Sequence, residues 1–259
     1  MVRDVRMRGF AERADVEEVL RHLRETASPL SAEPVPLLEC VGRVLAEDVV
    51  AGVDVPGFAR SAMDGYAIRG EESFGASDYD PISFAVIGTS LPGVPFPGRV
   101  EPGQAVRIMT GAPLPEGADA VVMAEVCRER EDGARVELTD SVAPRKNVGA
   151  IGEDIRRGDR VLTAGRRLRP QDAGLLSSIG CAAVSCVRRP RVAFVITGDE
   201  LLPAGSRPSG ARIVDSNSVV LRALATRDGA APLPFEILPD VPERIREAMA
   251  DDRADVVLV

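Results

Sequence analysis

Hydrophobic residues near the N-terminus recur with helical spacing. Their positions follow i, i+3, i+4 and i+7, at Val16, Val19, Leu20 and Leu23. This spacing predicts an amphipathic helix that begins near Asp15 and ends before Pro29. Asp15 with Glu18 has the pattern of a capping box. A second apolar pattern of the same kind predicts another helix over residues 36–47.

The pattern changes between Val53 and about Val142, where short apolar runs alternate with Gly and Pro. Such runs, bounded by turn residues, are typical of strands. They cover residues 66–68, 82–87, 105–109 and 120–123. We therefore predict a compact β region, with the form of a small barrel. Helical patterns precede it, and a strand at 160–162 and a helix at 169–179 follow it, so the β region is expected to be an insertion in a larger domain.

The last 70 or so residues show strands and helices in alternation. Strands are predicted at 192–196, 235–238 and 256–259, with helices from about 216 to 229 and from 242 to 250. Near-continuous apolar strands in a β-α-β-α-β order indicate a parallel sheet covered by helices on both faces. Because the last strand is followed by no loop, although ligands of such sheets bind beyond the carboxyl ends of strands, we expect the chain to be truncated.

Composition places the chain among soluble globular proteins, with 45% hydrophobic and 28% charged residues over 259 positions. A net charge of −8 argues against nucleic acid as the main partner, because phosphate binding requires a basic surface. No run approaches the 18 or more apolar residues of a membrane helix. Residues 1–13 have no apolar core of a signal peptide, so a cytoplasmic location is expected, without a membrane partner.

Cysteine and histidine usage excludes several classes of site. The four cysteines form no CxxC pair, and His22 is the only histidine. A zinc site or a cysteine–histidine catalytic pair therefore has little support, and the cysteines are predicted to be buried thiols. His22 lies within the first helical pattern, far from any candidate nucleophile motif, which disfavours a Ser-His-Asp hydrolase.

Acidic and hydroxyl residues fall in loops that serve no apolar periodicity. Each position has a structural alternative: a type I′ hairpin turn for Asp64-Gly65, turn chemistry for Thr110, a solvated loop for Glu153-Asp154 and a helix N-cap for Asp240. The stretch Thr197-Gly198-Asp199-Glu200 ends the first strand of the α/β region, where such folds place ligands.

Several carboxylates without a histidine or thiolate cluster favour a hard cation such as Mg²⁺ over zinc. Magnesium in turn indicates a phosphorylated or otherwise anionic substrate. The chain has no Walker A loop, no GxGxxG after a strand and no kinase signature, so a standard nucleotide cradle is not predicted. The residues alone point to an acidic, Mg²⁺-dependent site assembled from several modules.

Four stretches taken together, and in this order, carry a family resemblance. They are SAMDGYA, GQAVRIMTGAPLPEGADAVVM, GEDI followed by RGDRVL, and VITGDELLPAG followed by RIVDSNS. The chain from about residue 13 onward resembles the molybdopterin molybdenumtransferases, the family of MoeA and of the gephyrin E domain. The resemblance implies an enzyme that inserts molybdate into adenylylated molybdopterin and releases AMP with the help of Mg²⁺.

The fold implied by the resemblance is α/β and multidomain. Residues 1–52 and 143–188 would form an elongated discontinuous mixed domain, residues 53–142 an inserted β-barrel-like domain, and residues 189–259 an incomplete three-layer α/β molybdopterin-binding domain. The family arrangement also implies a homodimer whose cleft combines the α/β domain of one subunit with the β domain of the other. A molybdopterin adenylyltransferase would supply the substrate.

The resemblance also assigns roles to individual residues. Catalytic roles fall on Glu200, Asp240 and Asp64, of which Glu200 and Asp240 would also hold Mg²⁺. Substrate binding falls on Thr110, Asp154 and Ser61.

Two departures from the family pattern qualify these roles. Gly149 stands where the family commonly has an arginine, which puts an anion contact in that loop in doubt. The sequence also stops at Val259, before the Gly-Gly-x-Ser-x-Gly loop and the lysine and arginine contacts to molybdate, so the fragment alone is not expected to complete a turnover.

Two other functions remain open at this point. One is a noncatalytic dimeric scaffold of the same fold that presents a protein-binding surface. Carboxylates at strand ends weigh against it, because a scaffold has no need of them. The other is a different enzyme that shares only the α/β module, such as a relative of nicotinamide mononucleotide amidohydrolase-associated proteins. The SAMDGYA and MTGAPLP stretches disfavour this second alternative.

Overall fold

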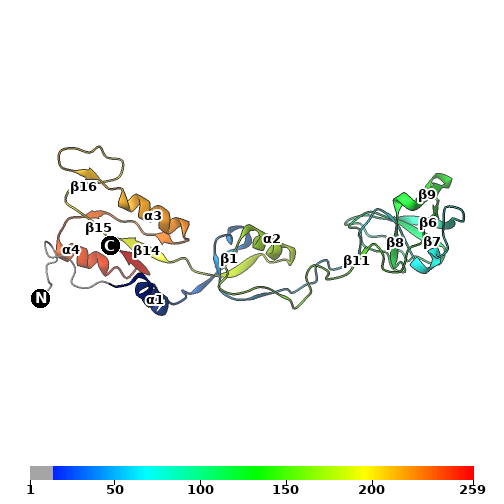
Figure 1. Ribbon diagram of the computed structural model, residues 1–259, viewed down its shortest axis with the longest axis horizontal. Coiled ribbons are helices and arrows are strands. Elements are labelled where there is room, and N and C mark those ends of the chain that lie inside the picture. The colour runs from blue at the N-terminus through cyan, green and yellow to red at the C-terminus, as the bar shows by residue number, and fades with distance from the viewer. Residues whose placement is uncertain (1–13) are drawn as a thin grey trace. The chain divides into compact units, whose positions relative to one another are not determined.

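The computed structural model describes residues 14–259 (Figure 1). They form two units. Unit 1 contains the described residues up to Ala46 together with Arg167–Arg169 and Ala183–Val259, and unit 2 contains Glu47–Arg166 and Pro170–Ala182. The prediction that residues 1–13 form no signal peptide concerns residues outside the described part of the chain. Over residues 14–259, no helix is long and apolar enough to cross a membrane.

A six-stranded sheet forms the core of unit 2, in the order β8-β5-β7-β6-β10-β9. Its strands are β5 (Gly65–Ile68), β6 (Ile82–Ser90), β7 (Gln104–Ile108), β8 (Ala120–Met123), β9 (Cys127–Arg130) and β10 (Arg135–Leu138). Three 3₁₀ turns accompany them, at Gly70–Ser73, Ala124–Val126 and Glu131–Gly133. All four residues of β5 are buried between β7 and β8, as an uninterrupted apolar strand requires. The β region predicted from the Gly- and Pro-bounded runs is confirmed.

The segments on either side of this sheet pair with each other. β3 (Val49–Val50) pairs antiparallel with β12 (Arg160–Leu162), and β4 (Arg60–Ser61) pairs antiparallel with β11 (Val148–Gly149). Helix α2 (Pro170–Ser178) follows β12. Chain entering and leaving the six-stranded sheet thus runs side by side, as an insertion requires, while the domain boundaries at 52/53, 142/143 and 188/189 stay a prediction.

The helix predicted over residues 36–47 is wrong. This stretch holds the end of β1 (Ala32–Pro36), a 3₁₀ turn (Leu37–Glu39) and β2 (Val44–Leu45), and both strands pair with β13 (Ala183–Val187). Gly42 has φ +82°, which interrupts any helix there. The strand partners come from a segment far away in sequence, so apolar spacing alone could not reveal them.

Helix α1 (Val16–Thr26) confirms the first helical pattern, and the four apolar residues of its stripe are all exposed. Asp15 occupies the N-cap position, but its side chain makes no capping hydrogen bond. The expected capping box is therefore not formed.

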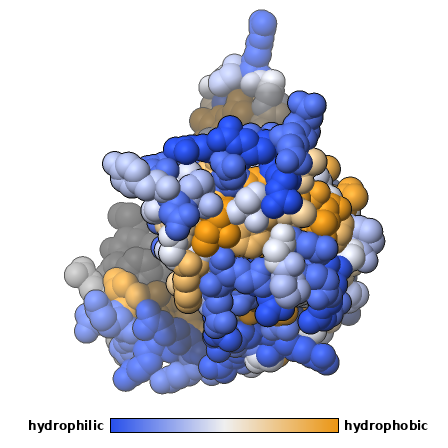
Figure 2. All heavy atoms as spheres, turned by 90° about the vertical axis from the view of Figure 1, so that its right-hand side faces the viewer, coloured by the Kyte–Doolittle hydropathy of each residue, from blue (hydrophilic) through white to orange (hydrophobic). Residues whose placement is uncertain are grey.

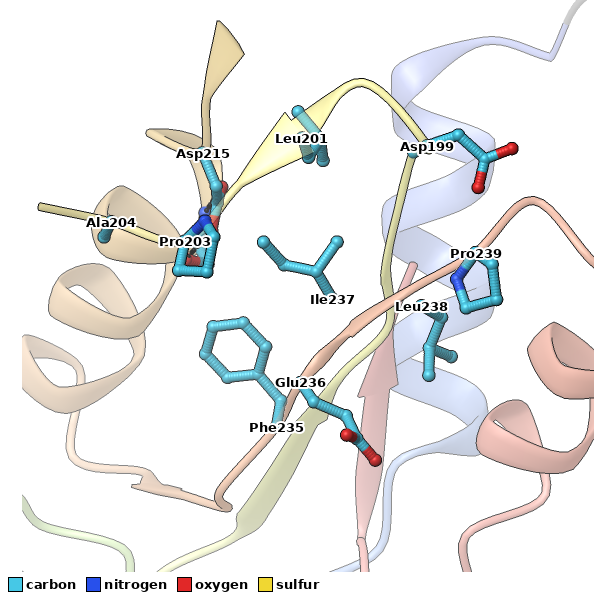
Figure 3. A pocket seen from close by; sticks show the side chains of 12 residues that line it. Asp199, Leu201, Pro203, Ala204, Asp215, Phe235, Glu236, Ile237, Leu238 and Pro239 are labelled. Carbon is cyan, nitrogen blue, oxygen red and sulfur yellow. Dashed lines mark hydrogen bonds between the residues drawn. The ribbon is translucent and has the colours of Figure 1, made fainter. Parts of the chain in front are cut away.

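Parallel strands and flanking helices build the C-terminal part of unit 1, as predicted. The strand predicted at 192–196 is interrupted at Val195 and forms two strands, β14 and β15. All strand pairs here are parallel, in the orders β18-β14-β20, β15-β19 and β16-β17. Helices α3 and α4 lie on opposite sides of these strands (Figures 1 and 3). The elements are β14 (Arg191–Phe194), β15 (Ile196–Thr197), β16 (Leu201–Leu202), β17 (Ile213–Val214), α3 (Asn217–Arg227), β18 (Ala231–Pro232), β19 (Ile237–Leu238), α4 (Pro242–Met249) and β20 (Val256–Leu258).

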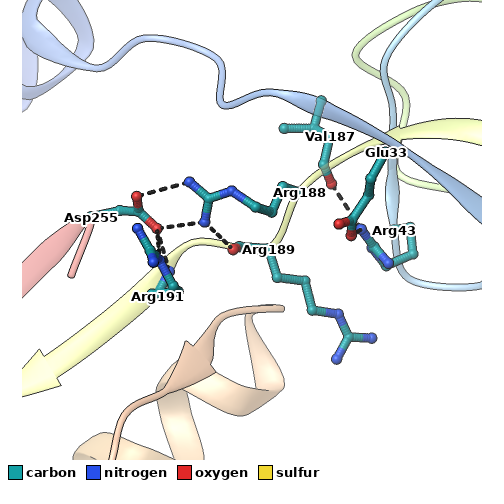
Figure 4. A network of polar contacts seen from close by, with 7 residues as sticks. All are labelled: Glu33, Arg43, Val187, Arg188, Arg189, Arg191 and Asp255. Carbon is teal, nitrogen blue, oxygen red and sulfur yellow. Dashed lines mark hydrogen bonds and ion pairs between the residues drawn. The ribbon is translucent and has the colours of Figure 1, made fainter. Parts of the chain in front are cut away.

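A charged network ties the segment between β13 and β14 to the start of β20 (Figure 4). The Arg188 guanidinium donates to both oxygens of Asp255, at 2.8 and 2.9 Å. The backbone N–H of Arg191 donates to the same carboxylate at 2.7 Å. These donors hold the pKa of Asp255 well below its usual range. The network fixes the entry of β14 beside its parallel neighbour β20.

Candidate functional site

A pocket of about 640 Å³ opens at the carboxyl ends of β15 and β19 (Figure 3). Ligands of open α/β sheets bind at this edge, because loops diverge where strands end and backbone polar groups become available. The pocket is lined by Gly198, Asp199, Leu201, Pro203, Ala204, Asp215, Ser218, Phe235, Glu236, Ile237, Leu238 and Pro239.

One wall of the pocket is apolar. Leu201 and Ile237 pack against the buried cluster of β14 and β15, and the Phe235 ring lies 6.0 Å from the Phe194 ring between centroids. The Arg222 guanidinium lies 5.7 Å from the Phe235 ring centroid, a cation–π distance. This wall offers an apolar surface on which a planar ring can lie.

The charged groups of the pocket are acidic. Asp199, Asp215 and Glu236 line it, and none of its lining residues is basic. Asp215 is 5% exposed, and its carboxylate accepts hydrogen bonds from the Ser218 N–H at 3.0 Å and from the Ser218 hydroxyl. Asp215 therefore caps the first turn of α3, whereas Asp199 is exposed at the end of β15.

The two predicted metal ligands, Glu200 and Asp240, lie in the loops after β15 and β19, beside the pocket rather than among its lining residues. Asp199 connects the two loops, because its Oδ1 accepts the Asp240 N–H at 3.4 Å. The Glu200 carboxylate folds back over Gly198, where a Cβ atom would lie 2.8 Å from Oε2. The N-cap of α4 is Val241, so Asp240 is not the helix cap that its sequence position allowed.

Asp64 and Thr110 meet in unit 2 at the ends of β5 and β7. The Thr110 N–H and hydroxyl both donate to Asp64 Oδ1 at 2.7 Å, which lowers the pKa of this carboxyl below its usual value. Neither Asp64 nor Gly65 has a positive φ, so the type I′ turn is excluded. Gly65 is required for close approach, since a Cβ there would lie 1.9 Å from the Val122 carbonyl oxygen.

Ser61 joins this pair to the loop that carries Asp154. Its N–H donates to the Ala112 carbonyl at 2.9 Å, its carbonyl accepts from the Gly111 N–H at 2.8 Å, and it pairs with Val148 across β4 and β11. The Ser61 hydroxyl is turned inward and bonds the backbone of Met63. The structure thus gives Ser61 a local structural role, and its contact with substrate stays a prediction.

Glu153 and Asp154 are not simply solvated acids. The Arg60 side chain donates to Glu153 Oε1 through Nε at 3.1 Å and through a terminal nitrogen at 2.7 Å. The same terminal nitrogen lies 3.6 Å from Asp154 Oδ2. Within unit 2 the structure therefore links Asp64 with Thr110 directly, and Ser61 with the Asp154 loop through strand pairing.

Apolar side chains remain exposed beside this part of unit 2. Phe58, Met63 and Ile151, each close in sequence to one of the motif residues, are 45%, 42% and 56% exposed. Figure 2 faces a different part of unit 2, the β6–β9 side, where apolar side chains also reach the surface among polar ones. A ligand that combines charged groups with an apolar body would find both kinds of contact beside the motif residues.

Carboxylates of the two loops beside the pocket are suited to a hard cation. No group of three or more His, Cys, Asp or Glu residues in the described part of the chain is arranged to hold a metal ion by itself. Mg²⁺ commonly binds through one or two carboxylates plus water and phosphate oxygens, so a site of that kind does not require three protein ligands.

Several residues that the structure brings into view were given no individual role by the sequence. Asp199, Asp215 and Glu236 line the pocket, and Arg60 holds the Glu153–Asp154 loop. Asp215 had a local signal, because Asp before Ser-Asn-Ser is typical of a helix start. Glu236 had none, because it lies between apolar residues of a predicted strand, and Arg60 had none, because its partner Glu153 is 93 positions away.

Comparison with known proteins gives two family matches. A family described as "MoeA N-terminal region (domain I and II)" matches residues 14–180, and one described as "Probable molybdopterin binding domain" matches residues 193–259.

Two curated relatives are named molybdopterin molybdenumtransferase. The chain is 36% identical to the one from Haemophilus influenzae over 239 residues, which covers 91% of this chain and 57% of the relative. It is 36% identical to the one from Bacillus subtilis over 240 residues, covering 90% and 56%. The chain thus spans little more than half the length of these relatives.

A solved structure shows the same fold. The crystal structure of the molybdopterin biosynthesis moeA protein from Pyrococcus horikoshii OT3 superposes with a TM-score of 0.85 at 38% identity, covering 93% of this chain and 64% of that one.

Proposed function

Because the chain belongs to the MoeA family, we propose that it forms part of an enzyme that inserts molybdate into adenylylated molybdopterin with release of AMP. One observation carries this proposal. The acidic pocket at the carboxyl ends of β15 and β19 lies within the residues that match the molybdopterin-binding domain. Fold and chemistry therefore favour the same place for the ligand.

Each side of the pocket suits one part of that substrate. A planar pterin ring fits the apolar wall formed by Phe235 and Ile237, where aromatic and aliphatic contacts require no charge. Its ring N–H groups find acceptors in the carboxylates of Asp199 and Glu236. The phosphate end would extend toward the loops of Glu200 and Asp240.

Glu200 and Asp240 are the residues proposed to hold Mg²⁺, which when bound would neutralise charge on the phosphoryl oxygens and act as a Lewis acid. In the same proposal Asp64 acts with them as a catalytic residue, while Thr110, Asp154 and Ser61 bind substrate. The double hydrogen bond from Thr110 keeps Asp64 ionised and oriented, which suits a group that contacts a metal or an N–H donor. A homodimer, with a molybdopterin adenylyltransferase as donor, completes the proposal.

Substrate binding by the purified protein, and AMP release by the enzyme of which it forms part, test this function. Adenylylated molybdopterin is titrated with and without molybdate and Mg²⁺, and AMP is measured by chromatography. Wild-type protein should bind the substrate, and Glu200→Ala should reduce AMP release and molybdenum insertion at least tenfold. Unchanged AMP release in Glu200→Ala would show that this residue was wrongly assigned.

Two alternatives predict different results. A noncatalytic dimeric scaffold of the same fold would form dimers but bind no molybdopterin. An enzyme that shares only the α/β module is disfavoured, because the family match extends over residues 14–180 as well.

A further inference from the structure

We propose that Arg60 and Glu153 are positioning residues of the site, whose ion pair orients the Asp154 carboxylate next to the strand pair β4–β11. The proposal rests on the proposed function, since it concerns how this face meets adenylylated molybdopterin. Neither residue is among those that the family resemblance assigned.

The contacts of Arg60 form a fork around one carboxylate and reach the next. Nε and a terminal nitrogen both approach Glu153 Oε1, at 3.1 and 2.7 Å, and the terminal nitrogen lies 3.6 Å from Asp154 Oδ2. A planar guanidinium cannot serve both partners unless their carboxylates are held at a fixed separation. Without it, the adjacent negative charges of Glu153 and Asp154 would repel each other.

Glu153 is also fixed from the other side. Its Oε2 accepts the Ala150 N–H at 3.1 Å, which closes the loop between β11 and Asp154. Gly149 lies directly across from Arg60 in the β4–β11 pair. A Cβ at Gly149 would lie 2.7 Å from Glu153 Oε1 and 3.0 Å from Oε2, so the carboxylate occupies the space that the missing side chain leaves.

Only the side chain of Asp154 remains to be oriented. Its backbone N–H donates to the Val55 carbonyl at 3.0 Å, and the Ile155 N–H donates to the same oxygen at 3.1 Å. The backbone is therefore held by the segment before β4, and the side chain, 58% exposed, turns toward Arg60.

Stability alone does not account for this arrangement. The Arg60 and Glu153 side chains are 38% and 34% exposed, and ion pairs this open to water contribute little to folding. A pair that adds little to stability but orients a loop acid is expected to affect ligand binding more than unfolding. This difference provides the test.

The experiment compares Arg60→Ala and Gly149→Ala with wild-type protein. The readouts are the Kd for adenylylated molybdopterin, the thermal midpoint and the exchange rate of the Ala150 amide. In Gly149→Ala the added methyl pushes the flexible end of Glu153 away while the backbone stays in place. Both variants should raise Kd by about 10- to 100-fold, as loss of a supporting contact does, and should accelerate Ala150 exchange.

Matched controls exist in the same unit. Arg128→Ala removes an exposed ion pair with the same 2.7 Å separation, to Asp78, and Gly52→Ala places a methyl in open space. Both should bind like wild type. Arg60→Lys, which keeps the charge without the fork, should recover part of the affinity. The midpoints of Arg60→Ala and Arg128→Ala should differ by no more than a few degrees.

The outcomes separate the two proposals. If wild-type protein binds adenylylated molybdopterin and the Arg60→Ala and Gly149→Ala variants bind equally well, the positioning proposal is wrong and the proposed function stands. If wild-type protein does not bind, the proposed function is overturned, and the positioning proposal with it. Equal losses in Arg60→Ala and Arg128→Ala would also refute positioning, because the effect would then belong to surface charge in general.

Discussion

Gly65, the first residue of strand β5, follows Asp64 directly, and a side chain at this position has no space. A Cβ at Gly65 would lie 1.9 Å from the Val122 carbonyl oxygen and 2.9 Å from its carbon, both backbone atoms of β8. Accommodation requires β5 and β8 to separate by about 1 Å, which breaks their ladder next to the buried Tyr66. Typical overpacking destabilises by about 1–3 kcal/mol, and Gly65→Ala should reach or exceed about 3 kcal/mol because rigid backbone must move.

At Gly174, substitution by alanine is expected to stabilise the protein rather than destabilise it. It lies exposed inside α2, its φ is not positive, and a Cβ there would meet no atom within 4 Å. Gly174→Ala should therefore stabilise the protein by about 0.5–1 kcal/mol, because alanine loses less backbone entropy in a helix. Both glycines belong to unit 2, so the pair compares a close approach with a free helix position inside one unit.

Urea unfolding measures the change in the free energy of unfolding, and thermal unfolding measures the midpoint. The chain has no tryptophan and two tyrosines, so tyrosine fluorescence reports on Tyr66, which is buried in β5, and on the fully exposed Tyr79. Gly65→Ala should lower the thermal midpoint by roughly 6–12 °C and Gly174→Ala should raise it by roughly 1–4 °C. Surface substitutions usually change the free energy of unfolding by no more than about 0.5 kcal/mol. If Gly65→Ala changes it by no more than this and strand β5 stays protected from amide exchange, the close-approach argument is refuted.

Three further predictions follow from hydrogen bonds of the site and its supports. Thr110→Val removes one of two donors to Asp64 and should raise the pKa of that carboxyl toward its usual value in an NMR titration. Because the folded pKa of Asp64 is lowered, the stability it contributes is present above the unfolded value near 3.8 and is lost as pH falls through the folded pKa, so Thr110→Val should weaken this acid dependence. Asp255→Asn should lower the thermal midpoint at pH 7, where Arg188 pairs with the charged carboxylate, and the difference from wild type should shrink as pH falls below the usual Asp pKa. Asp215→Ala removes the cap of α3 and should destabilise unit 1 by about 1–2 kcal/mol in urea unfolding, with Asp215→Asn closer to wild type because asparagine also caps helices.

Local patterns predicted the elements whose cause is local. The stripe of α1, the Gly- and Pro-bounded strands of the six-stranded sheet and the alternation of the α/β region all appear in the structure. The prediction at 36–47 was wrong because β1 and β2 are held by β13, which lies about 140 to 155 residues further along the chain. The apolar residues in this stretch do not share one buried helix face, because Leu38 is almost fully exposed while Leu45 is buried in the sheet.

In the candidate site, too, the sequence revealed some features and only the fold revealed others. Order and spacing of the motifs sufficed to identify Asp64, Thr110, Asp154 and Glu200 as candidates, because motif residues can be recognised without knowing their partners, whereas Asp240 was proposed from its place after a predicted strand. Their partners required the fold. The contact of Asp64 with Thr110 spans 46 positions, and that of Arg60 with Glu153 spans 93.

The sequence by itself determined the fold class, the family and the chemical character of the site, because turn residues, apolar runs and short acidic motifs act over a few positions. Tertiary structure alone decided that Asp199 and Asp215 rather than Glu200 line the pocket, and that Arg60 rather than solvent is the partner of the Glu153–Asp154 loop. The physical reason is that hydrogen bonds and ion pairs form between neighbours in space. Strand pairing, through β4 with β11 and β15 with β19, is what makes residues far apart in sequence into neighbours.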